Sequence, residues 1–344
     1  MYFLEHYALF LLNTATIVIA IIIILSVIFS LASRNKNNSK GKILIKKLNK
    51  DYQVMKQTLN QATLNKKAYK QLQKQEKRAE KTKQKKAKNT QQKKKRIFVL
   101  NFNGDIKASQ VTHLREEITA LLTIATHHDE VVVCLESPGG VVHGYGLAAS
   151  QLQRIRQHHI PLTIAVDKVA ASGGYMMACV ADKIIAAPFA IIGSIGVVLQ
   201  MPNFNKLLEK HNINYEMLTA GEYKRTLTMF GKNTDKGRDK MQQELEETQL
   251  LFKNFIAENR PIVNLQEVAT GEHWFAAKAI DYRLIDSLQT SDDYLLQASD
   301  EADIYELTKT SKKSLLQKLG KQTQLTFDAT LNKFWQEKQE QYYL

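Results

Sequence analysis

The sequence predicts an α/β fold with mostly parallel sheets, preceded by one transmembrane helix and a basic helical linker. Three features predict this arrangement. No charged residue occurs from position 7 to 33, positive charge gathers between 34 and 96, and short apolar runs alternate with amphipathic stretches after 96. The predicted parts are an anchor over 1–33, a linker over 34–96, a domain over 97–290 and an amphipathic helical tail over 291–344.

The composition suits a chain that buries a core. Of its 344 residues 44% are apolar and 24% charged, with 15 Gly and 5 Pro, which excludes collagen-like and wholly disordered proteins. Cys134 and Cys179 are too few for a disulfide framework. Both stand among apolar neighbours, so we expect buried free thiols.

The first 33 residues have the length and hydropathy of a membrane-spanning helix. A cleaved signal peptide is the alternative, because Ser30-Leu31-Ala32 offers small residues for a cleavage site. The start of the chain carries Glu5 and no Lys or Arg, however, and the apolar run is long for a signal peptide, so a retained anchor is favoured. The basic residues that follow the run predict a cytoplasmic location for the rest of the chain.

Positive charge is concentrated in the linker. Residues 34–96 contain 23 Lys or Arg and three acidic residues, a local charge of +20 in a chain of +14, so that the remainder carries −6. Apolar residues between 48 and 69 step by three and four, which predicts a short helical or coiled-coil seam, and 74–95 is expected to be a solvated or frayed helix. This charge would attract anionic lipid headgroups. Nucleic-acid binding is disfavoured because no aromatic platform or known motif accompanies the charge.

The domain shows alternating strands and helices. Four segments are predicted as strands buried on both faces: 97–102, 131–135, 162–166 and 183–187. Two segments, 110–126 and 144–159, are predicted as helices, and the alternation predicts βαβ units.

Segment 184–201 lacks charge and is apolar enough to be considered as a second membrane span. Because Pro188, Gly193, Ser194 and Gly196 interrupt it, we interpret it as a buried strand and the wall of a site.

Two glycine-rich turns follow apolar runs and carry the candidate chemistry. They are Glu136-Ser137-Pro138-Gly139-Gly140 and Ala170-Ala171-Ser172-Gly173-Gly174-Tyr175. Loops at the carboxyl ends of parallel strands build sites, and a serine in such a turn is placed as a nucleophile beside backbone N–H groups. An ordinary tight turn with a serine cap is the alternative for each turn alone.

A serine nucleophile needs a base. Lys224, after the strand-like segment 215–218, is the better candidate, because an amine kept out of water beside Arg225 is favoured in its neutral form. His143 is the rival, and a solvated Lys-Arg loop is the alternative without function.

These motifs are similar to those of a known family. The runs Leu135-Glu136-Ser137-Pro138-Gly139-Gly140, Ala171-Ser172-Gly173-Gly174-Tyr175, Ile192-Gly193-Ser194-Ile195-Gly196 and Gly221-Glu222-Tyr223-Lys224-Arg225 resemble the signal peptide peptidase A family of Ser-Lys serine peptidases. The anchor, the basic stretch and Val142-His143-Gly144-Tyr145-Gly146 are similar to its SohB branch.

The resemblance implies a ClpP/crotonase-type fold and a serine endopeptidase. It implies Ser172 as nucleophile, Lys224 as general base, Ser194 as the hydroxyl that orients the lysine, and an oxyanion hole from Gly139 with Gly140 or Gly173. It implies no cofactor and no metal, a peptide or protein substrate, and a ring-like homo-oligomer at the bacterial inner membrane. Two features depart from the family: Arg283 stands where relatives have glycine, and relatives face the periplasm rather than the cytoplasm.

Two other functions share parts of this pattern. A crotonase-like acyl-CoA enzyme would have the fold and the Gly-Gly turns, without a use for Ser172 paired with Lys224. A catalytically silent membrane scaffold would act through the basic linker and the tail.

Overall fold

The computed structural model describes residues 12, 14–20, 41–89 and 94–310. The chain divides into two compact units, 1–43 with 309–344 and 44–308, and the second unit holds the predicted domain. The predicted C-terminal tail from 311 onward lies outside the described residues, as does most of the predicted anchor. Among the described residues, no helix has the length and apolar character to cross a membrane.

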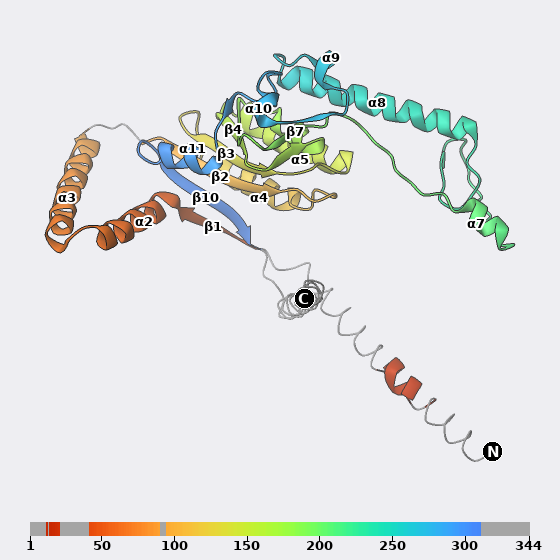
Figure 1. The fold of residues 1–344 in the computed structure, drawn as a ribbon, viewed down its shortest axis with the longest axis horizontal. Coiled ribbons are helices and arrows are strands. Elements are labelled where there is room, and N and C mark those ends of the chain that lie inside the picture. Colours follow the sequence, from red (N-terminus) through yellow and green to blue (C-terminus); the bar gives the residue numbers. More distant parts are fainter. Residues whose placement is uncertain (1–11, 13, 21–40, 90–93, 311–344) are drawn as a thin grey trace, which may run out of the picture. The chain divides into compact units, whose positions relative to one another are not determined.

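A seven-stranded sheet forms the centre of the second unit (Figure 1). Every pairing from β10 across to β9 is parallel, as the alternating pattern predicts. In order across the sheet the strands are β1 (Lys42–Lys47), β10 (Asp303–Thr310), β2 (Arg96–Asn103), β3 (Glu130–Glu136), β4 (Leu162–Val166), β6 (Lys183–Ala186) and β9 (Ser287–Leu288).

The central strands are buried on both faces because their side chains alternate between two cores. Phe98, Leu100 and Val133 belong to a large core, whereas Val99 and Val132 belong to a smaller one on the opposite face. Helices α4 (Val111–Leu122), α5 (Val142–Gln157) and α6 (Gly173–Ala178) contribute to the large core. Helix α11 (Ser291–Ala298) contributes to the small one. The four strands and two helices predicted from the sequence are confirmed.

A second, three-stranded sheet carries the candidate site. It consists of β5 (Val169–Ala171), β7 (Ile191–Gly193) and β8 (His273–Phe275), in that order. An isolated parallel bridge between Ser137 and Ala170 connects the end of β3 to β5. Segment 184–201 therefore contains β6 and β7, which confirms the strand interpretation over a second span.

The domain extends beyond the predicted end near 290, and that boundary is wrong. Strand β10 pairs in parallel with β2, with Ile304 opposite Ile97. Only Ile304 and Leu307 of its eight residues are buried, and the strand lies next to the edge strand β1, so it lacks the continuous apolar run that identified the others.

The basic linker forms a helical hairpin rather than one continuous seam. Helix α2 (Leu48–Thr63) and helix α3 (Lys66–Asn89) are separated at Leu64, where the backbone is extended. Asn65 starts α3, because its side chain accepts the N–H of Ala68 at 2.9 Å.

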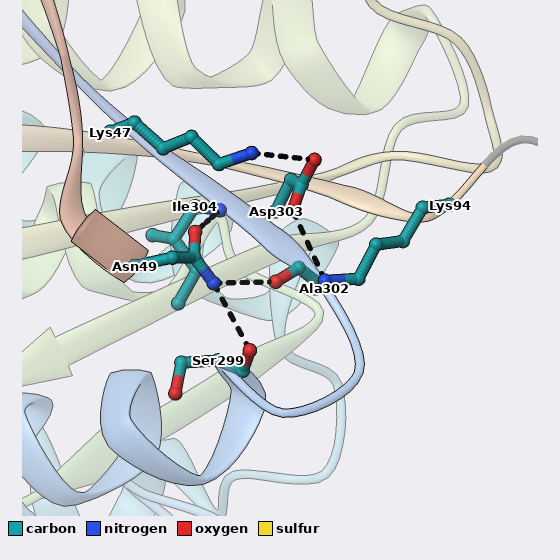
Figure 2. Close-up of polar contacts among 7 residues, drawn as sticks. All are labelled: Lys47, Asn49, Lys94, Ser299, Ala302, Asp303 and Ile304. Atoms are coloured by element: carbon teal, nitrogen blue, oxygen red, sulfur yellow. Dashed lines mark hydrogen bonds and ion pairs between the residues drawn. The ribbon is translucent and has the colours of Figure 1, made fainter. Parts of the chain in front are cut away.

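Both ends of this hairpin are fixed to the turn between α11 and β10 (Figure 2). Asn49 donates to the carbonyl oxygens of Ser299 and Ala302 at 3.0 and 2.9 Å and accepts the N–H of Ile304 at 2.7 Å. Lys47 before the hairpin and Lys94 after it both pair with Asp303, as Figure 2 shows. Burial alone would raise the pKa of the Asp303 carboxyl, but the two lysines outweigh it and hold that pKa below its usual value.

Arg283 adopts a left-handed backbone conformation that glycine adopts readily and other residues rarely do. Its φ is +58°, which costs a non-glycine residue of the order of 1 kcal/mol. The turn is held in place because Arg260 donates to the Arg283 carbonyl at 2.9 Å and pairs with Asp286 through both guanidinium NH2 groups. These contacts therefore hold a residue with a side chain in a conformation that favours glycine.

The first prediction concerns that strain. Arg283→Gly is expected to raise the free energy of unfolding by about 1 kcal/mol, because the left-handed conformation costs glycine nothing. Urea denaturation of both proteins would measure the change. Arg115→Gly in the middle of α4 is the control and should lose about 1 kcal/mol. A loss of stability in Arg283→Gly would contradict this account of the turn.

The second prediction concerns Asn49. Asn49→Ala removes three hydrogen bonds, each contributing about 1 kcal/mol, and should lower the free energy of unfolding by about 3 kcal/mol. It should also speed hydrogen exchange at the amide of Ile304. Gln61→Ala, an exposed change in the same helix, is the control. Equal stability and equal exchange in the two variants would show that Asn49 does not fix the hairpin.

Candidate active site

Ser172 occupies a strained turn between β5 and α6. Its backbone has φ +50° and ψ −118°, a region that residues with a side chain rarely adopt. Its N–H donates to the Gly193 carbonyl at 2.8 Å, and its carbonyl accepts the N–H of Met176 at 2.9 Å. All six residues of α6 are buried, whereas Ser172 is half-buried. A serine forced into such a turn at the start of a buried helix resembles a nucleophile elbow.

Ser194 lies at the end of the neighbouring strand. Strands β5 and β7 run parallel, with Ala171 opposite Gly193. Ser172 and Ser194 are the next residues after this pair, and the backbones of neighbouring strands lie about 4.8 Å apart. Ser194 also has a positive φ, +51°, and its N–H donates to the Glu272 carbonyl at 2.7 Å. The backbone thus brings together two serines that are 22 positions apart in the sequence.

The first glycine turn packs directly on Ser172. Gly139 has φ +89°, and a Cβ on it would lie 2.8 Å from the Cβ of Ser172 and 2.8 Å from the N of Gly173. Only glycine permits this approach. Gly173 is buried at the start of α6, so the backbones of Gly139 and Gly173 flank the serine. Gly140 instead packs against Ile106, where an added Cβ would lie 2.2 Å from the carbonyl oxygen.

Lys224 is exposed in the single chain. It lies in an irregular exposed segment before α8 (Asp235–Asn259), and within the described residues its ammonium group has no hydrogen bond or ion pair. The expectation of a dry lysine is therefore not met in this chain, and the predicted strand over 215–218 does not form. The reason is that the chain leaves the body after Gly196: Val198 is 76% exposed and Leu218 is 96% exposed.

The turn that carries Lys224 is nevertheless ordered by its neighbours. Gly221 has φ +97° and accepts the N–H of Lys224 at 3.2 Å. Glu222 pairs with Lys236 in the first turns of α8, and the hydrogen bond from Lys236 lowers the pKa of that carboxyl. The ring of Tyr223 lies beneath the ammonium groups of Lys236 and Lys240.

The other candidates are placed away from this chemistry. His143 is exposed in the first turn of α5. Among the described residues, no three His, Cys, Asp or Glu side chains are grouped closely enough to hold a metal ion. Cys179 is buried and Cys134 half-buried, and burial raises the pKa of the Cys134 thiol to about 11.

Sequence reasoning missed two buried hydroxyls behind the glycine turn, Ser137 and Tyr145. Their side-chain oxygens lie 2.6 Å apart, and neither residue is exposed to solvent. Each residue lies in a motif that the sequence analysis identified. Spacing along the sequence does not show, however, that the side chains of residues eight positions apart form a hydrogen bond.

Comparison with known proteins identifies the family. The model of "Peptidase family S49 N-terminal" matches residues 2–152, and that of "Peptidase family S49" matches residues 154–305. The 1510-N membrane-bound stomatin-specific protease in complex with a substrate peptide is a similar solved structure, with a TM-score of 0.44 and 15% identity. It covers 66% of this chain and 99% of its own.

Relatives of similar length extend over most of the chain. "Probable protease SohB" of Haemophilus influenzae is 49% identical over 330 residues, which is 93% of each chain. "Probable protease SohB" of Buchnera aphidicola subsp. Schlechtendalia chinensis is 47% identical over 302 residues, 86% of this chain and 99% of the relative. The chain belongs to peptidase family S49, and it is a serine peptidase.

Proposed function

We propose that this peptidase is a membrane-anchored endopeptidase in which Ser172 and Lys224 form a Ser-Lys dyad. The observation that carries the proposal is the strained Ser172 turn with Gly139 packed against it. Strain of this kind persists only where neighbouring structure holds it, and it gathers at active sites. No other serine in the described residues combines a positive φ with two flanking glycine backbones in this way.

The proposed reaction has two halves. The neutral amine of Lys224 takes the proton of the Ser172 hydroxyl as Oγ attacks the peptide carbonyl, and the backbone N–H of Gly139 with that of Gly173 stabilises the negative oxygen. The proton then passes to the leaving amine. Water, deprotonated by the same lysine, hydrolyses the acyl-enzyme and restores Ser172. Ser194, at the end of β7, would hold the lysine by accepting from its amine.

Lys224 needs a partner surface to act as this base. The segment 197–232 exposes many apolar side chains, and Arg225 follows the lysine. Monomers rarely leave so much apolar surface in water, so we propose that the segment packs against a second copy in a ring-like homo-oligomer, which would exclude water from Lys224. The exposed apolar residues are Val198, Leu199, Phe204, Leu207, Ile213, Tyr215, Met217, Leu218, Tyr223, Met229 and Phe230.

Extended apolar segments of membrane-derived peptides, signal peptides or misfolded proteins are the proposed substrates. Strand β8 is an edge strand of the sheet that carries Ser172, and Phe275 at its end lies edge-to-face with Phe189. These rings are 54% and 82% exposed. An unpaired strand edge beside exposed aromatic rings suits an extended apolar peptide.

Anchoring at the bacterial inner membrane is proposed from residues 7–33 and from the basic hairpin. Helix α3 alone has 11 Lys or Arg and two acidic residues, and charge of this sign is attracted to anionic headgroups. Because both ends of the hairpin are fixed at Asp303, lipid contact there would orient the catalytic domain. A reporter fused to the C-terminus distinguishes the cytoplasmic side, favoured by the basic flank, from the periplasmic side of the relatives.

The third prediction tests the dyad. Ser172→Ala and Lys224→Ala should each lower kcat for peptide hydrolysis by about 10³-fold or more with the fold intact, and Lys224→Ala should abolish labelling of Ser172 by a fluorophosphonate. Lys232→Ala, an exposed lysine of the same segment, is the control. Undiminished turnover in either dyad variant would contradict the dyad.

Two outcomes would support the catalytically silent scaffold instead of the enzyme. One is a biological role that survives Ser172→Ala, and the other is a well-folded wild type whose Ser172 is never labelled.

The fourth prediction tests the assembly. Leu218→Glu places a charge where the single chain is 96% exposed, so it should leave the monomer stable but dissociate the oligomer and reduce labelling of Ser172. Sedimentation in detergent measures the mass, and labelling measures the active fraction. Ile124→Glu, a 53% exposed apolar residue outside segment 197–232, is the control. An unchanged mass with Leu218→Glu would exclude this segment from the interface.

A further inference from the structure

The hydroxyls of Ser137 and Tyr145 connect the glycine turn to the interior of the domain. The N–H of Gly139 donates to Ser137 Oγ at 3.1 Å, and Ser137 Oγ lies 2.6 Å from the Tyr145 hydroxyl. The Tyr145 hydroxyl in turn donates to the Asp105 carbonyl at 2.8 Å. A tyrosine hydroxyl carries one hydrogen, so Ser137 is the donor to Tyr145. The three bonds run in one direction, from Gly139 to Asp105.

This series is closed to water. Ser137 and Tyr145 are both 0% exposed, and a Cβ on Gly104 would lie 2.3 Å from each hydroxyl oxygen. Burial raises the pKa of Tyr145, so its hydroxyl remains a neutral donor at physiological pH. In so tightly packed a series, a lost hydroxyl leaves its neighbours unsatisfied.

The same two residues contact the nucleophile turn. The carbonyl of Ser137 accepts the N–H of Ala171 at 3.0 Å, one residue before Ser172. The ring of Tyr145 packs on Gly173, where an added Cβ would lie 2.4 Å from its Cγ. The Ser137 side chain also packs on Gly174. Ser137 and Tyr145 therefore contact the chain on both sides of Ser172 and also the turn that holds Gly139.

We infer that Ser137 and Tyr145 are positioning residues for oxyanion stabilisation, with Tyr145 acting through Ser137 on the peptide of Gly139. In the resting chain Ser137 Oγ accepts the Gly139 N–H. A negatively charged oxygen on the substrate carbon is a stronger acceptor than a hydroxyl, so the N–H turns to it, while the bond to Tyr145 keeps Ser137 in place. This role rests on the proposed function.

The test compares two buried tyrosines. Tyr145→Phe removes the hydroxyl that holds Ser137, and Tyr175→Phe removes a hydroxyl that is equally buried but donates to the Leu284 carbonyl at 3.1 Å. Tyr145→Phe loses the hydrogen bonds with Ser137 and with the Asp105 carbonyl, and Tyr175→Phe loses the one with the Leu284 carbonyl, so both variants should lose stability. Each full-length variant is purified in detergent, and its kcat, KM and inhibition constant for a peptide boronate are measured below its unfolding temperature.

The expected result separates positioning from general stability. Tyr145→Phe should lower kcat by about 10- to 100-fold and weaken the boronate, which forms a tetrahedral adduct on serine, in the same proportion, with KM little changed. Ser137→Ala should act in the same way, and Ser137→Cys should recover part of the loss because sulfur is a weak acceptor. Tyr175→Phe should keep kcat within about twofold of wild type.

Two outcomes overturn the inference. Wild-type turnover that depends on Ser172 but is unchanged in both Tyr145→Phe and Ser137→Ala overturns this inference alone and leaves the proposed function standing. Equal losses of kcat in Tyr145→Phe and Tyr175→Phe, with no selective weakening of the boronate, would show a structural role only. A folded wild type without Ser172-dependent turnover overturns the proposed function and this inference together.

Discussion

The close approach of two backbone turns is the constraint on which the candidate site depends. Gly139 lies so near Ser172 that a single added carbon would meet three atoms of the nucleophile turn at 2.8 Å. The positive φ of Ser172 strains its turn, and the positive φ of Gly139 is one that glycine adopts readily and residues with a side chain do not. Such a pair survives only if the surrounding elements fix both backbones. The pairing of β5 with β7, the bridge from Ser137 to Ala170 and the fully buried helix α6 provide that fixation.

The two proposed catalytic groups come from parts of the chain with different physical character. Ser172 belongs to a packed body in which nearly every neighbour is buried. Lys224 belongs to a segment that exposes apolar side chains and is tied mainly to the start of α8. A site divided in this way would be completed by association, so that activity depends on the concentration of assembled protein. In the proposed function, the basic hairpin would also connect the catalytic domain to an anionic membrane surface.

Burial determines which strands could be predicted from the sequence. Strands β2, β3, β4 and β6 were predicted because both faces of each are buried, so their apolar residues are contiguous. Strand β10 was missed because it lies near the sheet edge and buries only two of its eight residues. Strands β5, β7 and β8 are only three residues long. The break between α2 and α3 involves only Leu64 and Asn65, so the heptad spacing of apolar residues did not reveal it.

By itself the sequence determined the α/β class, the order of the buried elements, the glycine turns and the serine that follows the third strand, because local hydropathy and backbone freedom specify these features. Tertiary structure decided which side chains meet. It placed Ser194 beside Ser172 through strand register, joined Ser137 to Tyr145 behind the glycine turn, and left Lys224 in water. Such contacts depend on how separate elements are aligned in space, and neither residue type nor spacing along the chain specifies that alignment.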